Sequence, residues 1–342
     1  MSVVIAWDIG GVHLKAARAD NGRIVDAVQV ASPLRLGLER VADAFGEIKP
    51  RIGSAPRHVL TMTAELADTF PTRRDGVERL ARMAAQQLAG SDVLVYAGRA
   101  GFVSPESAGK HVEDIASANW HASASLVARL CGTALFLDMG STTTDIVPVA
   151  GGALRSHGYT DAERLAAGEL VYTGLVRGFV MAVADRAPLG GHWTTLINEN
   201  FANMADVHRI LDSLPDDADK MMTADGRAKT VTASRARLAR MLGRDADEGE
   251  DAEWLELARW FAEVQIRAVT DGAMLVLSRA MLPASAPVVG AGVGTEVIAE
   301  VARRLSRPYV GFATLLDASP AVGKLAAQCA PAAALATMAS RA

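Results

Sequence analysis

Cysteine is scarce in this chain, and so are aromatic residues and long unbroken hydrophobic runs. With only two cysteines among 342 residues, Cys131 and Cys329, a disulfide framework is excluded, and we expect both thiols to be buried and reduced. The alanine-rich stretch at 326–339 is too short, and too broken by Pro331, to cross a membrane. The N-terminus runs directly into a β-prone segment without a basic leader. We therefore expect a cytoplasmic protein without a membrane partner.

Concentrated positive charge is also missing. The 35 basic residues are scattered and the formal net charge is −4, so no nucleic-acid partner is expected. The sequence lacks a G-x-S-x-G elbow and a C-x-x-C pair, which leaves serine-nucleophile and zinc-ribbon chemistry without support. Half of the residues are hydrophobic, and the length suffices for two domains with substantial cores. The oligomeric state stays open, with a homo-oligomer as one alternative.

Two stretches 130 residues apart, 7–15 (WDIGGVHLK) and 137–145 (LDMGSTTTD), repeat one pattern. Each follows an apolar segment, places an aspartate at its end, continues with small turn residues and enters a second β-prone run. This predicts a β-hairpin whose tip holds an anion, because glycine permits a tight turn and consecutive N–H groups form a nest for phosphate oxygens. Two such hairpins predict a central cleft between related halves that closes on a polyphosphate.

The two predicted hairpins supply the catalytic candidates. We expect Asp8 and Asp138 to hold Mg²⁺ or phosphate rather than to act only as turn caps. Lys15 and His13 share one face of their strand. Lys15 is expected either to reach a phosphate or to lie solvated, and His13 either to act in catalysis or to be structural. The expected phosphate-binding residues at the two tips are Gly10, Gly11, Gly140, Ser141, Thr142 and Thr143.

The chain reads as two similar α/β halves, 1–131 and 132–342, each led by one hairpin. The turn signal Asn21-Gly22 separates the second and third expected strands. Residues 158–250 are expected to form an irregular insertion that carries specificity. The expected strands are 3–7, 14–20, 23–30, 58–62, 93–96, 134–137, 144–148, 153–157, 287–289 and 308–310, and the expected helices are 34–48, 73–88, 123–130, 254–282 and 296–305.

A third glycine-rich stretch follows the strand expected at 287–289. Gly290, Gly292 and Gly294 alternate and lead into a helix, a pattern that brings a backbone close to a flat or charged ligand. Tight packing between a strand and a helix explains the same pattern. We count the three glycines among the phosphate-binding candidates because they lie downstream of two phosphate hairpins.

Three polar clusters complete the candidate set. Residues 62–68 (MTAELAD) follow a strand end, where α/β proteins place ligand contacts. Residues 166–174 (AAGELVYTG) are expected to open a helix that faces the cleft. In the insertion, Glu199, Asp206 and His208 match no metal pattern, and we expect them to be solvated loop charges.

These motifs resemble a known family. DIGGVHLK and DMGSTTTD are similar to the phosphate hairpins of the actin, sugar-kinase and Hsp70 superfamily, and more closely to the hydantoinase/oxoprolinase group, whose motifs read approximately DIGGTFTD and DMGGTSTD. MTAELAD, SANW (117–120), GELVYTG and TADG resemble a short branch linked to tetrahydromethanopterin-dependent one-carbon transfer and methanofuran synthesis. The resemblance covers nearly the whole chain. It implies a duplicated actin/sugar-kinase/Hsp70-like (ribonuclease H-like) α/β fold.

The resemblance further implies a metal-dependent transferase. It would join γ-glutamyltyramine to an aminomethylfuran-methyl diphosphate, forming an aryl ether and releasing diphosphate. A diphosphate ester and a phenolic amine are thus the implied small-molecule partners, and the substrate's ammonium group is expected to meet Glu65, Asp68 or Glu169. The chain departs from hydantoinases at 12–15 (VHLK), where they keep hydroxyl residues, and it lacks their extra length. Both departures argue against ATP-driven ring opening.

Two other functions stay open at this point. An ATP-dependent kinase or amide-activating hydrolase is favoured by the glycine run at 288–294 and predicts nucleotide binding detectable by calorimetry. A non-catalytic, nucleotide-switched partner protein of the actin type would polymerise or dock a client. The sequence gives no sign of the exposed apolar patch that such a protein needs.

Overall fold

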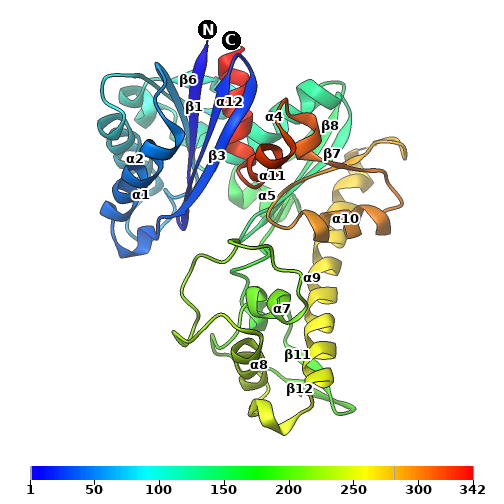
Figure 1. Cartoon of the computed structure of the whole chain (residues 1–342). Coiled ribbons are helices and arrows are strands. Elements are labelled where there is room, and N and C mark those ends of the chain that lie inside the picture. Colours follow the sequence, from blue (N-terminus) through cyan, green and yellow to red (C-terminus); the bar gives the residue numbers. More distant parts are fainter. Residues whose placement is uncertain (1, 281, 342) are drawn as a thin grey trace. The chain divides into compact units, whose positions relative to one another are not determined.

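The computed structural model describes residues 2–280 and 282–341, and the chain forms two compact units. Unit 1 comprises Met1–Phe136, Val147–Arg164 and Val310–Ala342, and unit 2 comprises Leu137–Ile146 and Leu165–Tyr309. Figure 1 traces the chain through the elements named below. The division into sequence halves at residue 131 stays a prediction.

A six-stranded sheet of order β3-β2-β1-β4-β5-β6 forms the centre of unit 1. Its strands are β1 (Val3–Ile9), β2 (His13–Asp20), β3 (Arg23–Ala31), β4 (Arg57–Met62), β5 (Asp92–Tyr96) and β6 (Phe102–Val103). β1 pairs antiparallel with β2 and parallel with β4, which pairs parallel with β5. The C-terminal ends of β1, β4 and β5 therefore meet at one edge, the carboxyl edge. The expected strands are confirmed here, and the Asn21-Gly22 turn has the two positive φ angles of a type I′ turn.

Helices cover both faces of the first sheet (Figure 1). On one face, Phe45 of α1 (Glu39–Ile52) packs on Trp7 of β1 with a ring separation of 4.6 Å, and α2 (Arg73–Gln87) contributes to the same core. On the other face, α12 (Ala330–Ser340) contacts β1, β2 and β4. Other helices are α3 (Val112–Ile115), α4 (Asn119–Cys131), α5 (Asp161–Ala166) and α11 (Pro320–Gln328). The single helix expected at 34–48 is wrong, because Gly37 at φ 125° separates a 3-10 turn (Leu34–Leu36) from α1.

The second sheet repeats the strand arrangement of the first. Its order is β10-β8-β7-β13-β14, with β9 paired to β8. The strands are β7 (Ala134–Met139), β8 (Thr144–Ala150), β9 (Ala153–Leu154), β10 (Leu170–Val171), β13 (Val288–Gly292) and β14 (Tyr309–Gly311). In each sheet the first hairpin strand, β1 or β7, lies between its hairpin partner and a later strand, β4 or β13. This duplication confirms the α/β fold class expected from the sequence.

The segment expected to be an irregular insertion is folded. It contains α6 (Val180–Val183), α7 (Met204–Ile210), α8 (Val231–Arg240) and the hairpin of β11 (Arg186–Leu189) and β12 (His192–Thr195). Their apolar side chains form a core with Trp254 and Phe261 of α9 (Asp251–Ala280). The expectation of irregularity was wrong because these elements are too short for a periodic pattern to stand out. α10 (Thr295–Arg304) follows β13.

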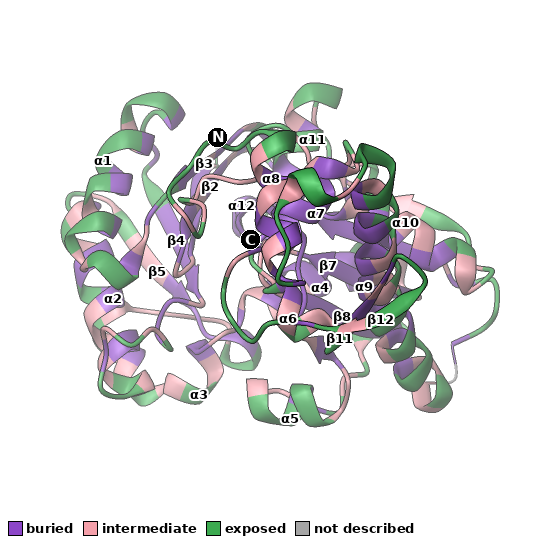
Figure 2. Ribbon diagram, turned by 90° about the horizontal axis from the view of Figure 1, so that it is seen from below, coloured by how far each residue is buried: buried purple, intermediate pink, exposed green. Residues whose placement is uncertain are grey.

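Burial follows this layered arrangement. Figure 2 shows β4 and β7 in the colour of buried residues, whereas α1 and α2 carry exposed residues on their outer sides. None of the described helices is both long and apolar enough to span a bilayer. Within the described part of the chain neither cysteine forms a disulfide. Cys329 is buried, but Cys131 is only half-buried at the end of α4, where burial still raises the pKa of its thiol.

Candidate functional site

The first hairpin closes through a glycine. The Gly10 N–H donates to the His13 carbonyl at 2.9 Å, between the end of β1 and the start of β2. A Cβ atom on Gly10 would lie 2.9 Å from the same carbonyl oxygen, whereas a Cβ atom on Gly11 would meet no atom within 4 Å. The turn therefore requires glycine at position 10, and position 11 leaves room for a ligand beside the tip.

Asp8 and Lys15 face each other across this hairpin. They are paired in register, and Lys15 Nζ lies 3.9 Å from Asp8 Oδ2. Trp7 and Ile9 belong to the core under α1 and α2, so strand alternation places Asp8 on the opposite face of the sheet. The Asp8 side chain is 4% exposed, and His13 is also buried. Asp8 and Lys15 therefore form an ion pair next to the tip of this hairpin.

The segment after β4 lies at the same carboxyl edge. Thr61 is next to Asp8 in the parallel register, and the Thr63 N–H donates to the Ile9 carbonyl at 3.0 Å. The MTAELAD motif thus begins beside the first hairpin. Because open α/β sheets bind ligands outside the carboxyl ends of their strands, this edge is the candidate site of unit 1.

Glu65, itself buried, joins a partly buried polar group that we call the Glu65 network: Glu65, Arg73, Ser117 and Asp161. Ser117 Oγ lies 2.9 Å from Glu65 Oε1 and 3.0 Å from Asp161 Oδ2, and Arg73 donates to Asp161 Oδ2 at 2.8 Å. Burial raises the pKa of Glu65 to about 7, against the lowering effect of hydrogen bonds from its own backbone and from Ser117. The network joins two motifs of the sequence analysis, MTAELAD and SANW.

Local backbone geometry brings these groups together. Gly76 in α2 allows the helix to approach Glu65, since a Cβ atom at position 76 would lie 2.5 Å from the Glu65 carbonyl oxygen. Ser117, in the turn between α3 and α4, has a φ of 53°, a conformation that few residues other than glycine adopt. Backbone strain of this kind is concentrated at functional sites.

Aromatic side chains lie next to the Glu65 network. Trp120, three residues after Ser117, contacts the rings of His121 and Tyr159 at centroid distances of 5.4 and 5.8 Å. The Arg164 guanidinium stacks 4.0 Å from the Trp120 ring centre. Burial lowers the pKa of His121 to about 4, so this imidazole is neutral at physiological pH. Sequence reasoning missed Asp161, Tyr159 and Arg164, because nothing local marks residues that meet only through the fold.

The other two carboxylates considered for an ammonium group lie in different surroundings. Asp68 is exposed on the turn after β4. Glu169, in unit 2, is fully buried, and Arg279 donates to its Oε1 at 2.9 Å. The expectation that 166–174 opens a helix is wrong: Leu170–Val171 is strand β10, paired with β8, because β-branched and aromatic residues favour a strand there.

The second hairpin tip, in unit 2, is closed in the same way as the first. The Gly140 N–H donates to the Thr143 carbonyl at 2.9 Å. The backbone carbonyl groups of this tip accept hydrogen bonds from one neighbouring segment. The Leu175 N–H donates to the Gly140 carbonyl, and the Arg177 N–H donates to the Ser141 carbonyl at 2.7 Å. Asp138 is buried at the end of β7. The same kind of backbone hydrogen bond therefore closes both tips, as the similarity of the two sequence motifs predicts.

Arg177 is a basic residue at this tip that the sequence analysis did not single out. Besides its backbone bond to Ser141, its Nη1 lies 3.5 Å from Thr142 Oγ1. Gly174 makes the contact between the two segments possible, because a Cβ atom there would lie 2.5 Å from the Thr142 nitrogen. A guanidinium group fixed beside a turn of this kind suits the binding of an anion.

The buried side-chain amide of Gln265 contacts the segment that lies beside the second hairpin tip. Gln265 of α9 donates to Thr173 Oγ1 and to the Gly174 carbonyl, both at 2.9 Å. Its Oε1 accepts from His208 Nε2 at 2.8 Å, which leaves His208 Nδ1 to accept from Ser213. His208 is thus a structural, neutral imidazole, and burial lowers its pKa. The expectation that it is a solvated loop charge was wrong.

The alternating glycines after β13 pack against the second hairpin. Gly292 has a φ of 86°, and a Cβ atom on it would lie 2.2 Å from the Met139 carbonyl oxygen. Gly294 donates to that carbonyl at 3.1 Å and lies against the Met139 side chain, and Gly290 lies under Tyr309. Close packing explains all three glycines. Phosphate binding by Gly290, Gly292 and Gly294 stays a prediction.

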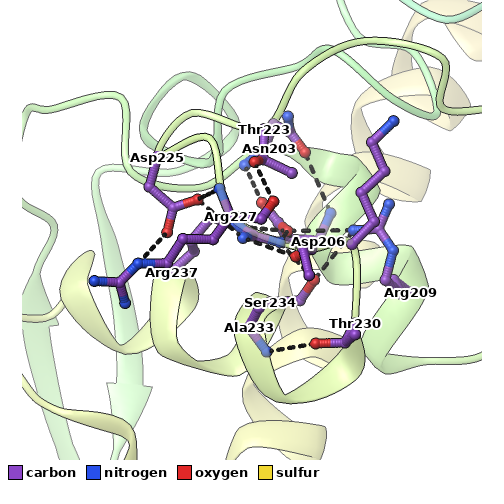
Figure 3. A network of polar contacts seen from close by, with 12 residues as sticks. Asn203, Asp206, Arg209, Thr223, Asp225, Arg227, Thr230, Ala233, Ser234 and Arg237 are labelled. Atoms are coloured by element: carbon purple, nitrogen blue, oxygen red, sulfur yellow. Dashed lines mark hydrogen bonds and ion pairs between the residues drawn. The ribbon is translucent and has the colours of Figure 1, made fainter.

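Of the charges expected to be solvated in the insertion, Glu199 is exposed as expected, but Asp206 belongs to a buried network (Figure 3). Arg237 is fully buried, and its Nε and Nη1 donate to Asp206 and Asp225 at 2.8 and 3.1 Å. Arg209 also donates to Asp206, and Ser234 bonds the same carboxylate oxygen. Asp225 belongs to the TADG motif, so that motif holds the loop before α8 in place. The prediction failed because polar residues within an unassigned segment look like loop residues.

A metal site of three or more protein ligands is absent among the described residues. Asp8 in unit 1 and Asp138 in unit 2 each offer one carboxylate beside a glycine turn. Mg²⁺ in phosphate-transferring proteins is often held by one or two carboxylates, with phosphate oxygens and water as the other ligands. The donor set of each tip fits that ion, and its binding stays a prediction.

Comparison with known proteins defines first the fold class and then the family. The nucleotide-free structure of acetone carboxylase superposes on 97% of this chain and 70% of its own, with a TM-score of 0.60 and 11% identity. Together with the duplicated sheets, this shows the actin/sugar-kinase/Hsp70-like fold. The sequence profile of the family described as hydantoinase/oxoprolinase matches residues 57–332. The chain belongs to the hydantoinase/oxoprolinase family.

Two relatives share a name. The chain is 28% identical over 299 residues to (4-{4-[2-(gamma-L-glutamylamino)ethyl]phenoxymethyl}furan-2-yl)methanamine synthase of Methanocaldococcus jannaschii, which covers 86% of this chain and 87% of the relative. It is 27% identical over 173 residues to the protein of that name from Methanococcus vannielii, over 51% of this chain and 76% of the relative. The family expected from the paired hairpin motifs is thereby confirmed.

Proposed function

We propose that this protein is a transferase of methanofuran biosynthesis. It joins the phenol oxygen of γ-glutamyltyramine to the methylene carbon of an aminomethylfuran-methyl diphosphate. The bond between the phenol oxygen and the methylene carbon forms, the C–O bond from that carbon to diphosphate breaks with its electron pair on the leaving group, and the phenolic proton is released. The similarity to the M. jannaschii synthase along 86% of the chain is the observation that carries this proposal.

Each hairpin tip, taken by itself, offers groups that suit a departing diphosphate. Negative charge grows on the leaving oxygen, and fixed N–H groups and cations lower its energy. Lys15 offers an ammonium group beside Asp8 at the first tip, and Arg177 offers a guanidinium group at the second. Mg²⁺ would be held by Asp8 or Asp138, and it supplies charge neutralisation that eases the departure of diphosphate.

We assign the substrate's ammonium group to Asp68, because the three candidate carboxylates differ in how far their charge is available to a ligand. Arg279 already neutralises Glu169, and burial favours the neutral form of Glu65. Asp68 is exposed on the turn that leaves the carboxyl edge. An exposed carboxylate can pair with an ammonium group without the desolvation cost of a buried one.

An ATP-dependent kinase or amide-activating enzyme is the second candidate. The matching closure of the two tips, Gly10 to His13 and Gly140 to Thr143, favours it, because paired phosphate hairpins also suit a nucleotide. It predicts micromolar ATP binding by calorimetry in the absence of other substrates. Lack of such binding, together with pyrophosphate binding, excludes it.

Pyrophosphate release tests the proposed reaction. The purified protein with both substrates and Mg²⁺ is expected to release pyrophosphate, and omission of either substrate should abolish the release. Asp8→Asn should lower turnover at least about 100-fold and keep the melting temperature, because the charge is lost and the shape retained. Asp43→Asn, on the exposed side of α1, is the matched control. Equal phosphate release from ATP alone would contradict the proposal.

A further inference from the structure

The Ser117 hydroxyl lies between two carboxylates but carries only one hydrogen. Its Oγ is 2.9 Å from Glu65 Oε1 and 3.0 Å from Asp161 Oδ2. With both carboxylates ionised, one of these two contacts would join oxygen atoms with no hydrogen between them, and two acceptors at that distance repel each other. The geometry is therefore satisfied when one carboxyl group of the pair holds a proton.

Glu65 is the member of the pair that holds this proton. Asp161 already forms an ion pair with Arg73, whose guanidinium donates to Asp161 Oδ2 at 2.8 Å. Glu65 is 1% exposed, and burial favours its neutral form. The hydrogen bonds then run in one direction, from the Glu65 carboxyl to Ser117 and from Ser117 to Asp161.

The second oxygen of Glu65 is the unusual atom of the network. Glu65 Oε2 is buried and has no hydrogen-bond partner among the residues that the structure describes. Buried polar atoms are nearly always paired, and one that is not costs about 1 to 3 kcal/mol of stability. Such an atom at the carboxyl edge, two residues beyond Thr63, is explained if a ligand supplies its partner.

We propose that Glu65, in the molecules in which it has lost this proton, is the catalytic base that accepts the phenolic proton, with Ser117 and Asp161 as positioning residues. This inference rests on the proposed function. The phenol O–H bond breaks and an O–H bond to Glu65 forms, while the phenol oxygen bonds to the methylene carbon and diphosphate leaves with the electron pair of its C–O bond. The proton then passes to water, which restores the ionised base. The neighbouring rings of Trp120 and Tyr159 are suitable surroundings for a phenol.

The electrostatic surroundings of Glu65 fit proton exchange near neutrality. The charged groups that act on it are Asp161 at the start of α5, which raises its pKa, and Arg73 at the start of α2, which lowers it. A base works best when its pKa is near the working pH, since it is then both available and strong enough. An ordinary surface carboxylate would be ionised at pH 7 but much weaker as a base.

The first experiment measures the bound proton without any substrate. Folded Glu65 keeps a proton that the unfolded chain loses, so its contribution to wild-type stability should fall as the pH rises from about 4.5 to about 7. Glu65→Gln imitates the protonated carboxyl group and lacks this loss. The melting temperature of Glu65→Gln relative to wild type should therefore rise with pH, whereas that of Glu47→Gln, an exposed glutamate of α1, should run parallel to wild type.

The second experiment is the pH profile of turnover. Wild-type kcat/KM should rise with pH up to about 7 and then level off. Glu65→Gln should lower kcat about 100-fold or more and abolish the rise, while pyrophosphate binding, measured by calorimetry, stays at the wild-type value. Asp161→Asn removes a charge that raises the pKa of Glu65, so the rise should move to lower pH. A purely structural role would not move this profile.

The outcomes separate the two proposals. If the melting temperatures of wild type and Glu65→Gln change in parallel with pH, folded Glu65 does not hold the proton, and its proposed role as the catalytic base is overturned as well. A Glu65→Gln enzyme that keeps wild-type turnover and pH profile overturns the catalytic role. If Glu65→Gln does not fold, an unmoved profile in Asp161→Asn overturns it. Absence of pyrophosphate release by wild type overturns the proposed reaction and the transfer of the phenolic proton, whereas the melting profiles still report whether Glu65 binds a proton.

Discussion

Lys15 Nζ and Asp8 Oδ2 lie 3.9 Å apart on neighbouring strands of the first hairpin, and both side chains are shielded from water. This pair accounts for Lys15 of the VHLK segment, which stands where the similar hydantoinase motif DIGGTFTD carries a second aspartate. The same ammonium group is suited to contact a diphosphate at the Gly10–Gly11 tip.

Lys15→Ala is expected to weaken the binding of pyrophosphate about tenfold or more, because a charge-assisted contact contributes about 1.5 to 3 kcal/mol. Isothermal calorimetry with pyrophosphate and Mg²⁺ measures this effect. The KM for the phenolic substrate should stay within about twofold of wild type. Lys110→Ala, an exposed lysine of the same unit, is the control. An equal loss for both substrates would mean that Lys15 supports the hairpin fold instead.

The hairpins could be predicted from sequence because their information is local. The Asp-Gly tips of 7–15 and 137–145 and the turn Asn21-Gly22 each fix their conformation within a few residues. Helix α12 gave no such signal. All of its residues are buried, so it has no polar face from which a helical period can be read. The sequence therefore gives no helical pattern for this alanine-rich segment.

The Glu65 network could not be predicted in the same way. Glu65 and Ser117 are 52 residues apart, and Ser117 and Asp161 are a further 44 apart. The motifs MTAELAD and SANW identify two of these segments in the sequence. Their contact at the carboxyl edge of the sheet follows from the fold and cannot be read from either motif. The buried Arg237 was hidden for a similar reason, since both of its aspartate partners lie in separate segments.

Gly292→Ala is expected to destabilise the protein by about 2 kcal/mol or more. The backbone at position 292 has a φ of 86°, and the added Cβ would lie 2.2 Å from the Met139 carbonyl oxygen. Gly11→Ala places the same methyl group in open space and should change stability by less than about 0.5 kcal/mol. Urea unfolding measures both variants. Equal stability of the two proteins would show that the packing on Met139 is not required.

Arg237→Met should lower the free energy of unfolding by about 3 kcal/mol. The substitution keeps much of the side-chain volume but leaves Asp206 and Asp225 without the buried cation that contacts both. Arg259→Met, which removes an exposed ion pair with Glu256 on α9, should cost less than about 1 kcal/mol. Chemical denaturation followed by circular dichroism compares them. A similar small loss in both variants would mean that the network of Figure 3 contributes little to stability.

The core of unit 1 contains a second pH-sensitive group. The Trp7 indole N–H donates to His58 Nδ1 at 3.0 Å, so this nitrogen cannot carry a proton while the bond is made. Burial lowers the pKa of His58 to about 4, and the charge of Lys49 lowers it further, against a backbone hydrogen bond that raises it. His58 is thus held neutral on β4, the strand that pairs with β1, which carries Asp8.

His58→Gln is expected to make the protein less sensitive to acid. The neutral imidazole stabilises the folded state above pH 6.5, and this contribution is lost as the pH falls from about 6.5 to about 4, because the unfolded chain then binds a proton that the folded chain excludes. The loss is about 3 kcal/mol. Glutamine keeps an acceptor for the Trp7 indole, so the melting temperature at pH 7 should change little, whereas the fall between about pH 6.5 and about pH 4 should be shallower than in wild type. His192→Gln, an exposed histidine on β12, is the matched control. An equally steep fall in His58→Gln would assign the acid sensitivity of the fold to other groups.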